Sequence, residues 1–384
     1  MNRDSWNIMK LGEICNILNG YAFDSKYFTN NTNAMPLIRI RDIKRGYTET
    51  FYTGIYNESY IVKKGDYIIG MDGEFNICQW ESINALLNQR ICKIWPRDTK
   101  STHIRYIYYF LSSLLKKIEE KTAFVTVKHL SSKQLNSSDI TIPVFSLQEQ
   151  IVKELDTLSD IITKKKEQLA ELDKLAQATF YDMFGDPVEN EKNWKTTLIQ
   201  NICTINPTKS SVKSLNSNLP VSFIPMAAVG EQGEFYANEI KLLHEVYKGF
   251  TYFEEGDILF AKITPCMENG KGAIARGLKN NIGFGSTEFH VLRPNSECNN
   301  SFLYFITKLD LFRKAAEKEM TGSAGQKRVP KSFLQKWTLI LPPISLQNQF
   351  AEKIEAIEKQ KALINQSITD TQLLFDYTMD KYFN

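Results

Sequence analysis

The residue types that most often carry out chemistry do not form a recognisable reactive set in this chain. Its four histidines, His103, His129, His244 and His290, show no ligand-like spacing, and its six cysteines include no C-x-x-C pair. Metal sites need several such ligands at short spacings, and serine nucleophiles often lie in G-x-S-x-G, which is absent. We therefore expect no catalytic residue, no metal site and no cofactor bound by this chain, and we interpret the cysteines as reduced core residues.

Polar segments at the ends of predicted strands are the remaining candidates for a functional site. In the second half of the chain they span residues 260–272, 283–289 and 321–330. The last of them places small residues, which let a backbone approach another surface, before Gln326, Lys327 and Arg328, which suit phosphate and base-edge contacts. Its first-half counterpart, Thr126–His129, keeps the lysine but not the glycines. Nucleic-acid binding is one interpretation, and surface loops without a ligand are the alternative.

These segments belong to a chain that is an internal duplication. Three pairs of strings occur in the same order in both halves: GDYII at 65–69 with GDILF at 256–260, Asn88-Gln89-Arg90 with Ser286-Thr287-Glu288, and IPVFSLQEQ at 142–150 with LPPISLQNQ at 341–349. Their offsets of 191, 198 and 199 residues change only in small steps, as expected for loop insertions in two copies of one fold. The duplication predicts two similar domains in a pseudo-two-fold relation.

Composition bounds the class of protein. The chain has 384 residues, of which 42% are hydrophobic and 24% charged, with a net charge of +3. No apolar run approaches the roughly 20 residues of a membrane-spanning helix, and the start lacks the apolar stretch of a signal peptide, so we expect a soluble, cytoplasmic protein. The small net charge does not by itself indicate a nucleic-acid-binding protein. Local groups of cations could still neutralise phosphates, such as Arg39, Arg41, Lys44 and Arg45.

Two kinds of sequence texture alternate along the chain. Residues 1–145 and 186–341 contain short β-rich runs broken by Gly, Asn and Pro, with a helical stretch near His103–Glu120. We expect these to be two similar mixed α/β domains, an α+β fold. Residues 146–185 and 342–384 have the long uninterrupted pattern of two helices.

The two predicted helices carry matching apolar stripes. Positions 155, 162, 169, 176 and 183 lie seven residues apart, the spacing of a coiled coil. The residues expected to pair are Ile151, Leu155, Leu158, Ile162, Leu169, Leu172, Phe350, Ile354, Ile357, Ile364, Ile368 and Phe375. We expect the helices to pack on each other or on a partner's helices; the alternative is that each lies on its own domain.

Two further features distinguish these helices. Each stripe has one cationic gap, because Lys165 stands at the place of Ile364 and Lys361 at the place of Ile162. The serines Ser146 and Ser345 precede the helical patterns and are predicted N-caps.

The chain resembles the specificity (S) subunits of Type I restriction-modification systems, the HsdS family. The resemblance covers nearly the whole chain and rests on GYAFDS, IPMAAV, GDILFAKITPCMENGKGAIA, IGFGSTEFHVLRP, AGQKRVP and the two P-x-x-S-L-Q-x-Q strings. Taken together and in duplicated order, these strings are highly specific.

The resemblance implies a function as well as a fold. Two target recognition domains would each read one half of a split DNA sequence through the major groove, and two antiparallel helices would act as spacer. The partners implied are double-stranded DNA, two methyltransferase (M) subunits that use S-adenosylmethionine, and two restriction (R) subunits that use ATP and Mg²⁺. The chain itself would be non-catalytic. The first domain lacks the F-A-K-x-x-P pattern of the second, which predicts an asymmetric target.

Cations and amides at the polar segments are the expected DNA-binding residues. In the first domain they are Arg39, Arg41, Asp72, Asn76, Gln89, Arg90, Lys128 and His129. In the second domain they are Lys262, Thr264, Asn269, Lys271, Ser286, Thr287, Gln326, Lys327 and Arg328.

Three alternatives remain open at this stage. The chain could be the DNA-reading subunit of a methyltransferase-only or Type II-like system. It could be a scaffold that organises two proteins without touching DNA, or an enzyme with an unrecognised active site.

Overall fold

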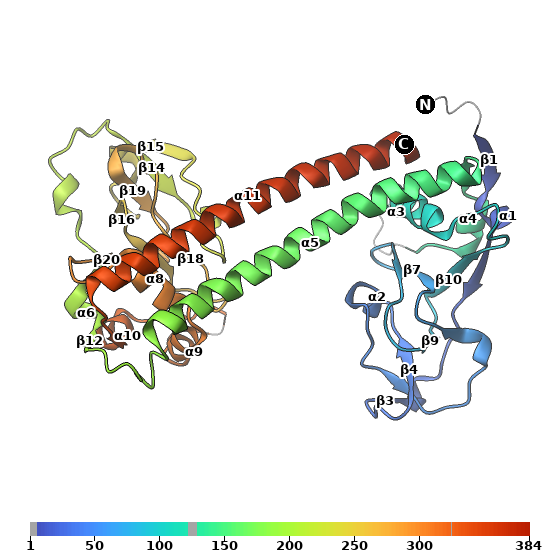
Figure 1. Cartoon of the computed structure of the whole chain (residues 1–384), viewed down its shortest axis with the longest axis horizontal. Coiled ribbons are helices and arrows are strands. Elements are labelled where there is room, and N and C mark those ends of the chain that lie inside the picture. Colours follow the sequence, from blue (N-terminus) through green and yellow to red (C-terminus); the bar gives the residue numbers. More distant parts are fainter. Residues whose placement is uncertain (1–5, 122–128, 324) are drawn as a thin grey trace. The chain divides into compact units, whose positions relative to one another are not determined.

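The chain forms two compact units (Figure 1). The computed structural model describes residues 6–121, 129–323 and 325–384. Unit 1 comprises the chain up to residue 167 together with residues 365–384, and unit 2 comprises residues 168–364. Each unit therefore contains a strand-rich domain, one end of helix α5 (Phe145–Phe184) and one end of helix α11 (Ile344–Phe383).

Unit 1 is built on three small sheets. A four-stranded antiparallel sheet has the order β2 (Cys15–Asn19), β10 (Ile91–Pro96), β7 (Tyr67–Gly70), β8 (Asn76–Gln79). A five-stranded sheet has the order β3 (Phe28–Thr29), β5 (Phe51–Tyr52), β4 (Met35–Ile38), β9 (Ala85–Leu87), β6 (Ile61–Val62), and β1 (Asn7–Lys10) pairs with β11 (Asp139–Ile142). Its helices are α1 (Leu11–Ile14), α2 (Asp42–Arg45), α3 (Ile104–Lys121) and α4 (Ser132–Ser137).

Unit 2 repeats this plan. Its first sheet has the order β13 (Cys203–Ile205), β20 (Phe289–Pro294), β17 (Ile258–Ala261), β18 (Gly272–Ile274). A second sheet has the order β15 (Glu239–Leu242), β14 (Pro220–Ile224), β19 (Ile282–Gly285), β16 (Thr251–Glu254), and β12 (Thr196–Leu198) pairs with β21 (Thr338–Ile340). Its helices are α6 (Ile199–Ile202), α7 (Leu243–Val246), α8 (Asn300–Lys308), α9 (Asp310–Lys318) and α10 (Lys331–Lys336).

The first sheets of the two units have the same connectivity. Strand β7 pairs with β10 and β8 in unit 1, just as β17 pairs with β20 and β18 in unit 2. Both central strands, with the sequences YIIG and ILFA, are buried along their whole length. Continuous apolar runs are typical of strands covered on both faces. The predicted α+β class with an internal repeat is confirmed.

The long helices are anchored in the cores of the units. In unit 1, Ile151 and Leu155 of α5 belong to the same buried cluster as Tyr382 of α11. In unit 2, Phe180 and Phe184 of α5 join Phe350 of α11. The two helices are antiparallel in each unit, because the start of α5 meets the end of α11 in unit 1 and the reverse holds in unit 2. None of the helices in the described part of the chain combines the length and the apolar character that a membrane-spanning segment requires.

The predicted N-caps are wrong. Helices α5 and α11 begin at Phe145 and Ile344, so Ser146 and Ser345 lie inside the first turn. The reason is a buried glutamine in each repeated S-L-Q string. Its side chain donates a hydrogen bond to the carbonyl of a proline before the helix, Pro143 or Pro342.

The first of these glutamines is Gln148. Its Nε2 donates to Pro143 O and to Ser101 O, both at 2.9 Å, and its Oε1 accepts from His103 N at 2.9 Å. The helix entry is thereby joined to the segment that leads into α3.

The second glutamine, Gln347, repeats this arrangement. Its Nε2 donates to Pro342 O at 2.8 Å and Glu297 O at 3.1 Å, and its Oε1 accepts from Asn299 N at 2.8 Å. The repeated string therefore encodes a repeated helix entry.

Candidate nucleic-acid interface

In unit 1, several predicted site residues meet where three backbone segments come together. Beyond β7 the chain continues to Asp72, which bridges to His129, and Arg90 directly precedes β10. The Met71 N–H donates to Arg90 O at 2.9 Å, and the Leu130 N–H donates to Met71 O at 2.7 Å. We call Asp72, Arg90 and His129 the unit 1 junction.

The side chains of this junction contact one another through the Asp72 carboxylate. The Asp72 carboxylate accepts a hydrogen bond from Arg90 Nη1 and lies 2.6 Å from His129 Nδ1. Burial raises the pKa of Asp72, but the hydrogen bonds from His129 and Arg90 outweigh this effect and hold the pKa below its usual value. Arg90 and His129 are exposed, so the junction presents nitrogen donors to solvent.

A basic turn lies beside this junction. Helix α2 and the residues before it carry Arg39 and Arg41, which are both exposed. Lys44 of α2 forms an ion pair with Glu74, in the loop that follows Asp72. The predicted basic cluster and the junction loop are therefore in contact.

The remaining candidates of unit 1 border the same loop. Asn76 begins β8, and its buried Oδ1 has no hydrogen-bond partner among the described residues. Gln89 is exposed next to Arg90, and its backbone N–H donates to Tyr21 O at 2.8 Å. Lys128 lies outside the described residues.

Unit 2 has an equivalent junction with different side chains. The Lys262 N–H donates to Glu288 O at 2.9 Å, and the Val329 N–H donates to Lys262 O at 2.9 Å, which repeats the backbone pattern of unit 1. Arg328 binds Glu288 with two parallel hydrogen bonds, Nε to Oε2 at 2.9 Å and Nη2 to Oε1 at 2.8 Å. We call Lys262, Glu288 and Arg328 the unit 2 junction.

The electrostatics of the unit 2 junction follow from this pairing. The hydrogen bonds from Arg328 hold the pKa of Glu288 below its usual value, against the effect of burial. Burial lowers the pKa of Lys262. The Glu288 carboxylate is thus paired with Arg328 and also interacts electrostatically with the Lys262 ammonium.

The two junctions differ in which strand supplies the acid. The backbone hydrogen bonds place Arg90 at the position of Glu288 and His129 at the position of Arg328. In unit 1 the acid is Asp72, which follows the central strand β7. In unit 2 the acid is Glu288, which directly precedes β20, the strand beside the central strand β17. Glu288 was not among the predicted site residues, although its alignment with Arg90 places an acid where unit 1 has a cation.

Other predicted residues of unit 2 surround Arg328. The Thr264 N–H donates to Lys327 O at 3.0 Å, and Gln326 O accepts from Arg328 Nη1 at 3.1 Å. The side chains of Gln326 and Lys327 are exposed. Ser286 Oγ accepts from the Glu288 N–H at 3.2 Å.

Three predicted residues of unit 2 do not join this cluster directly. Asn269 Nδ2 donates to Glu231 Oε1 at 2.9 Å, and Lys271 Nζ donates to Met226 O at 3.4 Å. Both side chains are therefore turned toward the segment that follows β14. Thr287 is exposed at the tip of the turn before β20.

The buried side chain of His290 is hydrogen-bonded to the backbone next to the unit 2 junction. His290 Nε2 lies 2.8 Å from Val329 O, and its Nδ1 lies 3.1 Å from Asn206 Nδ2. Burial lowers the pKa of His290 to about 4, so the ring is neutral, with Nε2–H as donor and Nδ1 as acceptor. The ring thereby fixes the backbone next to Arg328.

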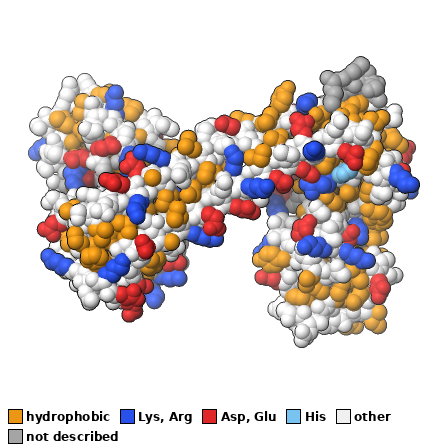
Figure 2. Space-filling model, in the orientation of Figure 1, with side chains coloured by type: hydrophobic (Ala, Val, Ile, Leu, Met, Phe, Trp, Pro, Cys, Tyr) orange, Lys and Arg blue, Asp and Glu red, His pale blue; other side chains and the backbone are white. Residues whose placement is uncertain are grey.

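Charge is distributed without a dominant sign. On the face shown in Figure 2, Lys and Arg side chains lie among Asp and Glu side chains over both units. This agrees with the net charge of +3. Any attraction for a polyanion therefore depends on local groups such as the junctions.

The predicted helix-pairing residues are buried or half-buried. Those in unit 1 are Ile151, Leu155, Leu158, Ile162, Ile368 and Phe375, and those in unit 2 are Leu169, Leu172, Phe350, Ile354, Ile357 and Ile364. Contacts within each unit fix the antiparallel register of the two helices. In unit 1 the Tyr382 hydroxyl donates to Glu154 Oε2 at 2.7 Å, and in unit 2 Lys361 forms an ion pair with Asp173.

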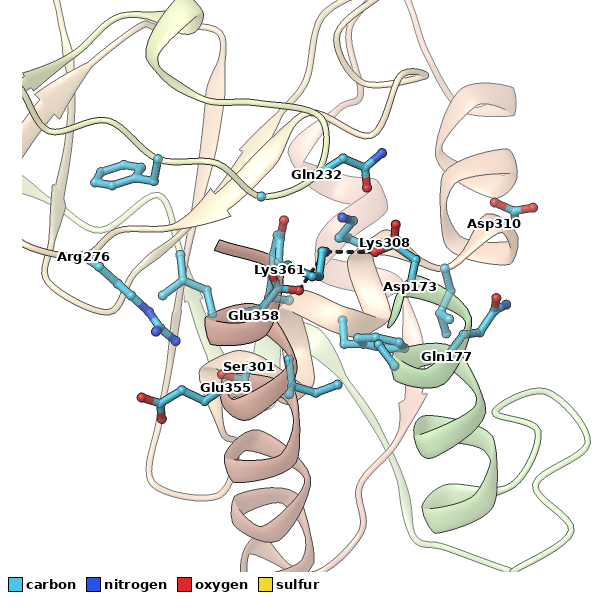
Figure 3. Close-up of a pocket in the computed structure, with 18 residues that line it drawn as sticks. Asp173, Gln177, Gln232, Arg276, Ser301, Lys308, Asp310, Glu355, Glu358 and Lys361 are labelled. Atoms are coloured by element: carbon cyan, nitrogen blue, oxygen red, sulfur yellow. Dashed lines mark hydrogen bonds and ion pairs between the residues drawn. The ribbon is translucent and has the colours of Figure 1, made fainter. Parts of the chain in front are cut away.

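The two cationic gaps are filled in different ways. Lys165 donates to Ser367 Oγ in unit 1. Lys361 lies between Asp173 of α5 and Glu358 of α11 in unit 2 (Figure 3). There it borders a cavity of about 480 Å³ between α5, α8, α11 and the loop at residues 232–235, lined by side chains of both charges.

No metal-binding cluster of three or more His, Cys, Asp or Glu residues occurs in the described part of the chain. The six cysteines are free, and Cys78 and Cys266 are half-buried while the others are buried.

Comparison with known proteins agrees with this architecture. The sequence profile of the family described as "Type I restriction modification DNA specificity domain" matches residues 3–174 and 191–371. The solved structure of the S subunit of a Type I restriction-modification system from M. genitalium superposes with a TM-score of 0.59 at 13% identity, covering 99% of this chain and 96% of that one. A second structure, from work on complex assembly and conformational transition of the type I R-M system, gives 0.53 at 15% identity, covering 99% and 97%. At such identities the structures show the fold alone.

Curated relatives match part of the chain at higher identity. The EcoBI specificity subunit of Escherichia coli is 41% identical over 172 residues, which is 45% of this chain and 36% of the relative. The EcoAI specificity subunit of the same species is 42% identical over 165 residues, 42% of this chain and 28% of the relative. The match thus spans about a third of these relatives' length. Since the family profile covers most of the chain in two copies, the chain belongs to the Type I restriction-modification DNA specificity family.

Proposed function

We propose that this chain is the DNA-reading specificity subunit of a Type I restriction-modification complex. In this proposal, residues 1–145 and 186–341 are recognition domains that each read one half of a split target through the major groove. The single observation that carries the proposal is the pair of junctions, which share one backbone position but carry exchanged charges. Two readers of the same build with different side chains suit an asymmetric target.

The exposed side chains at the junctions match what base edges and phosphates require. Arg binds guanine with two hydrogen bonds, and Gln or Asn binds adenine in the same way, each pair discriminating by about 1–3 kcal/mol. We assign base contacts to Gln89 and Arg90 in unit 1 and to Gln326 in unit 2. Lys327 is assigned to a phosphate, because its flexible ammonium is a point charge without base selectivity.

Arg328 has a different part in this proposal. Its guanidinium is occupied by Glu288. We infer that this pair holds the turn on which Gln326 and Lys327 are presented. The neutral His290 ring supports the same turn through Val329 O.

The helix pair would set the spacing of the half-sites and dock two M subunits. The spacer segments are residues 146–185 and 342–384. Apolar side chains on α11 support docking, because Leu363, Leu373, Leu374 and Tyr377 are exposed by between 52% and 72%. The partners would supply the chemistry: S-adenosylmethionine bound by the M subunits, and ATP and Mg²⁺ by two R subunits. The chain itself would be non-catalytic.

Methylome sequencing tests the proposal. A host that expresses the chain together with its cognate M subunit is expected to gain methyladenine in a split, asymmetric motif that is absent when either gene is expressed alone. No new motif in cells where both proteins accumulate and associate would contradict the proposal and favour a scaffold without DNA contact.

A further inference from the structure

Unit 2 contains a longer loop than unit 1 at the equivalent place in its first sheet. Seven residues, 70–76, separate the paired residues Ile69 and Ile77 in unit 1. Eleven residues, 261–271, separate the paired residues Phe260 and Gly272 in unit 2. The difference lies directly beside the junction, and we call residues 263–271 the unit 2 loop.

The unit 2 loop is folded into tight turns. The Met267 N–H donates to Ile263 O at 3.0 Å, the Asn269 N–H to Pro265 O at 3.0 Å, and the Lys271 N–H to Cys266 O at 2.9 Å. Three predicted DNA-binding residues, Thr264, Asn269 and Lys271, lie on it. Their placement therefore depends on whatever holds these turns.

One buried side chain holds the loop from inside the unit. Arg313 of α9 is only 8% exposed. Its Nη1 donates to Met267 O at 2.9 Å and its Nη2 donates to Gly270 O at 3.1 Å. Its guanidinium also lies 4.8 Å from the centre of the Phe260 ring.

The electrostatic setting of Arg313 is unusual. Within the described residues it forms no ion pair, and its buried Nε has no hydrogen-bond partner. Burial lowers its pKa to about 10. A buried cation without a carboxylate partner costs free energy, and its hydrogen bonds to the two loop carbonyls offset part of that cost. In the part of the chain that the structure describes, its hydrogen-bond acceptors are the Met267 and Gly270 carbonyls.

Among the residues of unit 1 that the structure describes, no buried arginine holds the equivalent loop. Its helix α3 runs from Ile104 to Lys121 without the break that separates α8 from α9. The single arginine of α3, Arg105, pairs instead with Asp156 of α5. The longer loop and its buried arginine therefore occur together, in one unit only.

We propose that Arg313 is a positioning residue that sets the base preference of unit 2 by holding the unit 2 loop in its reading conformation. This inference rests on the proposed function. It does not assign Arg313 a contact with DNA. The guanidinium acts through the Met267 and Gly270 carbonyls on the unit 2 loop, and the loop in turn holds the Gln326–Lys327 turn through the Thr264 N–H, which donates to Lys327 O at 3.0 Å.

The split target provides an internal control for the test. In a host expressing the full chain with its M subunit, Arg313→Met is expected to relax base preference at one or more positions of one half-site by about tenfold, which is the effect of losing one good base contact. The other half-site is expected to keep its preference unchanged. Arg313→Lys is expected to restore it in part, because an ammonium can reach one of the two carbonyls.

A matched variant separates positioning from stability. Arg293 of the same unit is half-buried and pairs with Asp257 and Glu254, away from the loop. Arg293→Met is expected to lower the overall methylation level while leaving the preferred bases of both half-sites unchanged.

The remaining outcomes are also decisive. Unchanged base preference in Arg313→Met, with a wild-type motif present, would overturn the inference but not the proposed function. If Arg313→Met does not accumulate, the base preference of Arg313→Gln is measured in its place. Failure of both variants to accumulate would overturn the inference, because the arginine would then serve the fold as a whole. The absence of any split motif with the wild-type chain would instead count against the proposed function.

Discussion

The Lys361 ammonium lies 2.9 Å from Asp173 Oδ1 and 3.0 Å from Glu358 Oε1, at a core position of the helix pair in unit 2. Only 9% of Lys361 is exposed. Burial lowers its pKa, but the hydrogen bonds and charges of the two acids outweigh this effect and raise the pKa above its usual value. A lysine in an apolar stripe is thus tolerated because acids from both helices reach it.

Removing one acid from this site is expected to destabilise the chain more than removing the lysine. Asp173→Ala should lower the free energy of unfolding by about 1–2 kcal/mol, below the 3–5 kcal/mol typical of broken buried pairs, because Asp173 is half exposed. Lys361→Met should lie within about 1 kcal/mol of wild type or be more stable, because an apolar side chain suits the stripe. Urea unfolding of both variants measures this, and a larger loss in Lys361→Met would contradict it.

The buried glutamines of the two helix entries are expected to be equally critical in both units. Gln148→Ala and Gln347→Ala each remove two donors and one acceptor that serve buried backbone groups, at a cost of about 2–4 kcal/mol. Urea unfolding of each variant measures the loss.

The repeated string contains its own control for this prediction. The second glutamine of each string, Gln150 or Gln349, is exposed. Its replacement by Ala should change the free energy of unfolding by less than about 0.5 kcal/mol. Equal losses at the first and second glutamines would show that the buried hydrogen bonds do not decide stability.

Stability is expected to fall on mild acidification because of His290. Its pKa is about 4 in the folded chain and near 6.5 when unfolded, so the unfolded state binds the proton first. The contribution is fully present above pH 6.5 and is lost at up to about 1.4 kcal/mol per pH unit as the pH falls toward 4. His290→Gln should be less stable at pH 7.5 but show a flatter dependence between pH 6.5 and 4.5. Parallel slopes in the two proteins would contradict the assignment.

Lys327 is expected to contribute to DNA affinity without selecting bases. Lys327→Ala should weaken binding to specific and nonspecific duplexes by a similar factor and reduce the slope of log K against log salt concentration by about one. Titrations of the purified complex at several salt concentrations measure both quantities. Loss of affinity for the specific duplex alone would instead indicate a base contact.

Much of the architecture could be predicted from the sequence because the chain repeats itself. The matching strings indicated two α+β domains, and the apolar heptads indicated long helices that pack together. The gaps at Lys165 and Lys361 were visible as mismatches between the two stripes. The acid that neutralises Lys361 was not, since Asp173 becomes its neighbour only through the antiparallel register.

The candidate site was predicted less completely. Clusters of polar residues after strands identified Asp72, Arg90 and His129, which the structure brings into contact. Glu288 and Arg313 were missed because one was aligned with a cation and the other lies in a helix far from the loop it supports. The N-caps were wrong because a buried glutamine, rather than the preceding serine, organises each helix entry.

Unit 1 is completed by residues 365–384, which follow unit 2 in the sequence; Tyr382 is buried in its core and Phe375 packs against it. A ribosome makes the strand-rich part of unit 1 before unit 2, yet the segment that closes its core emerges only after unit 2. Domains generally fold as they leave the ribosome. Here the segment that closes the core of unit 1 is made after all of unit 2, so unit 2 has the earlier opportunity to fold.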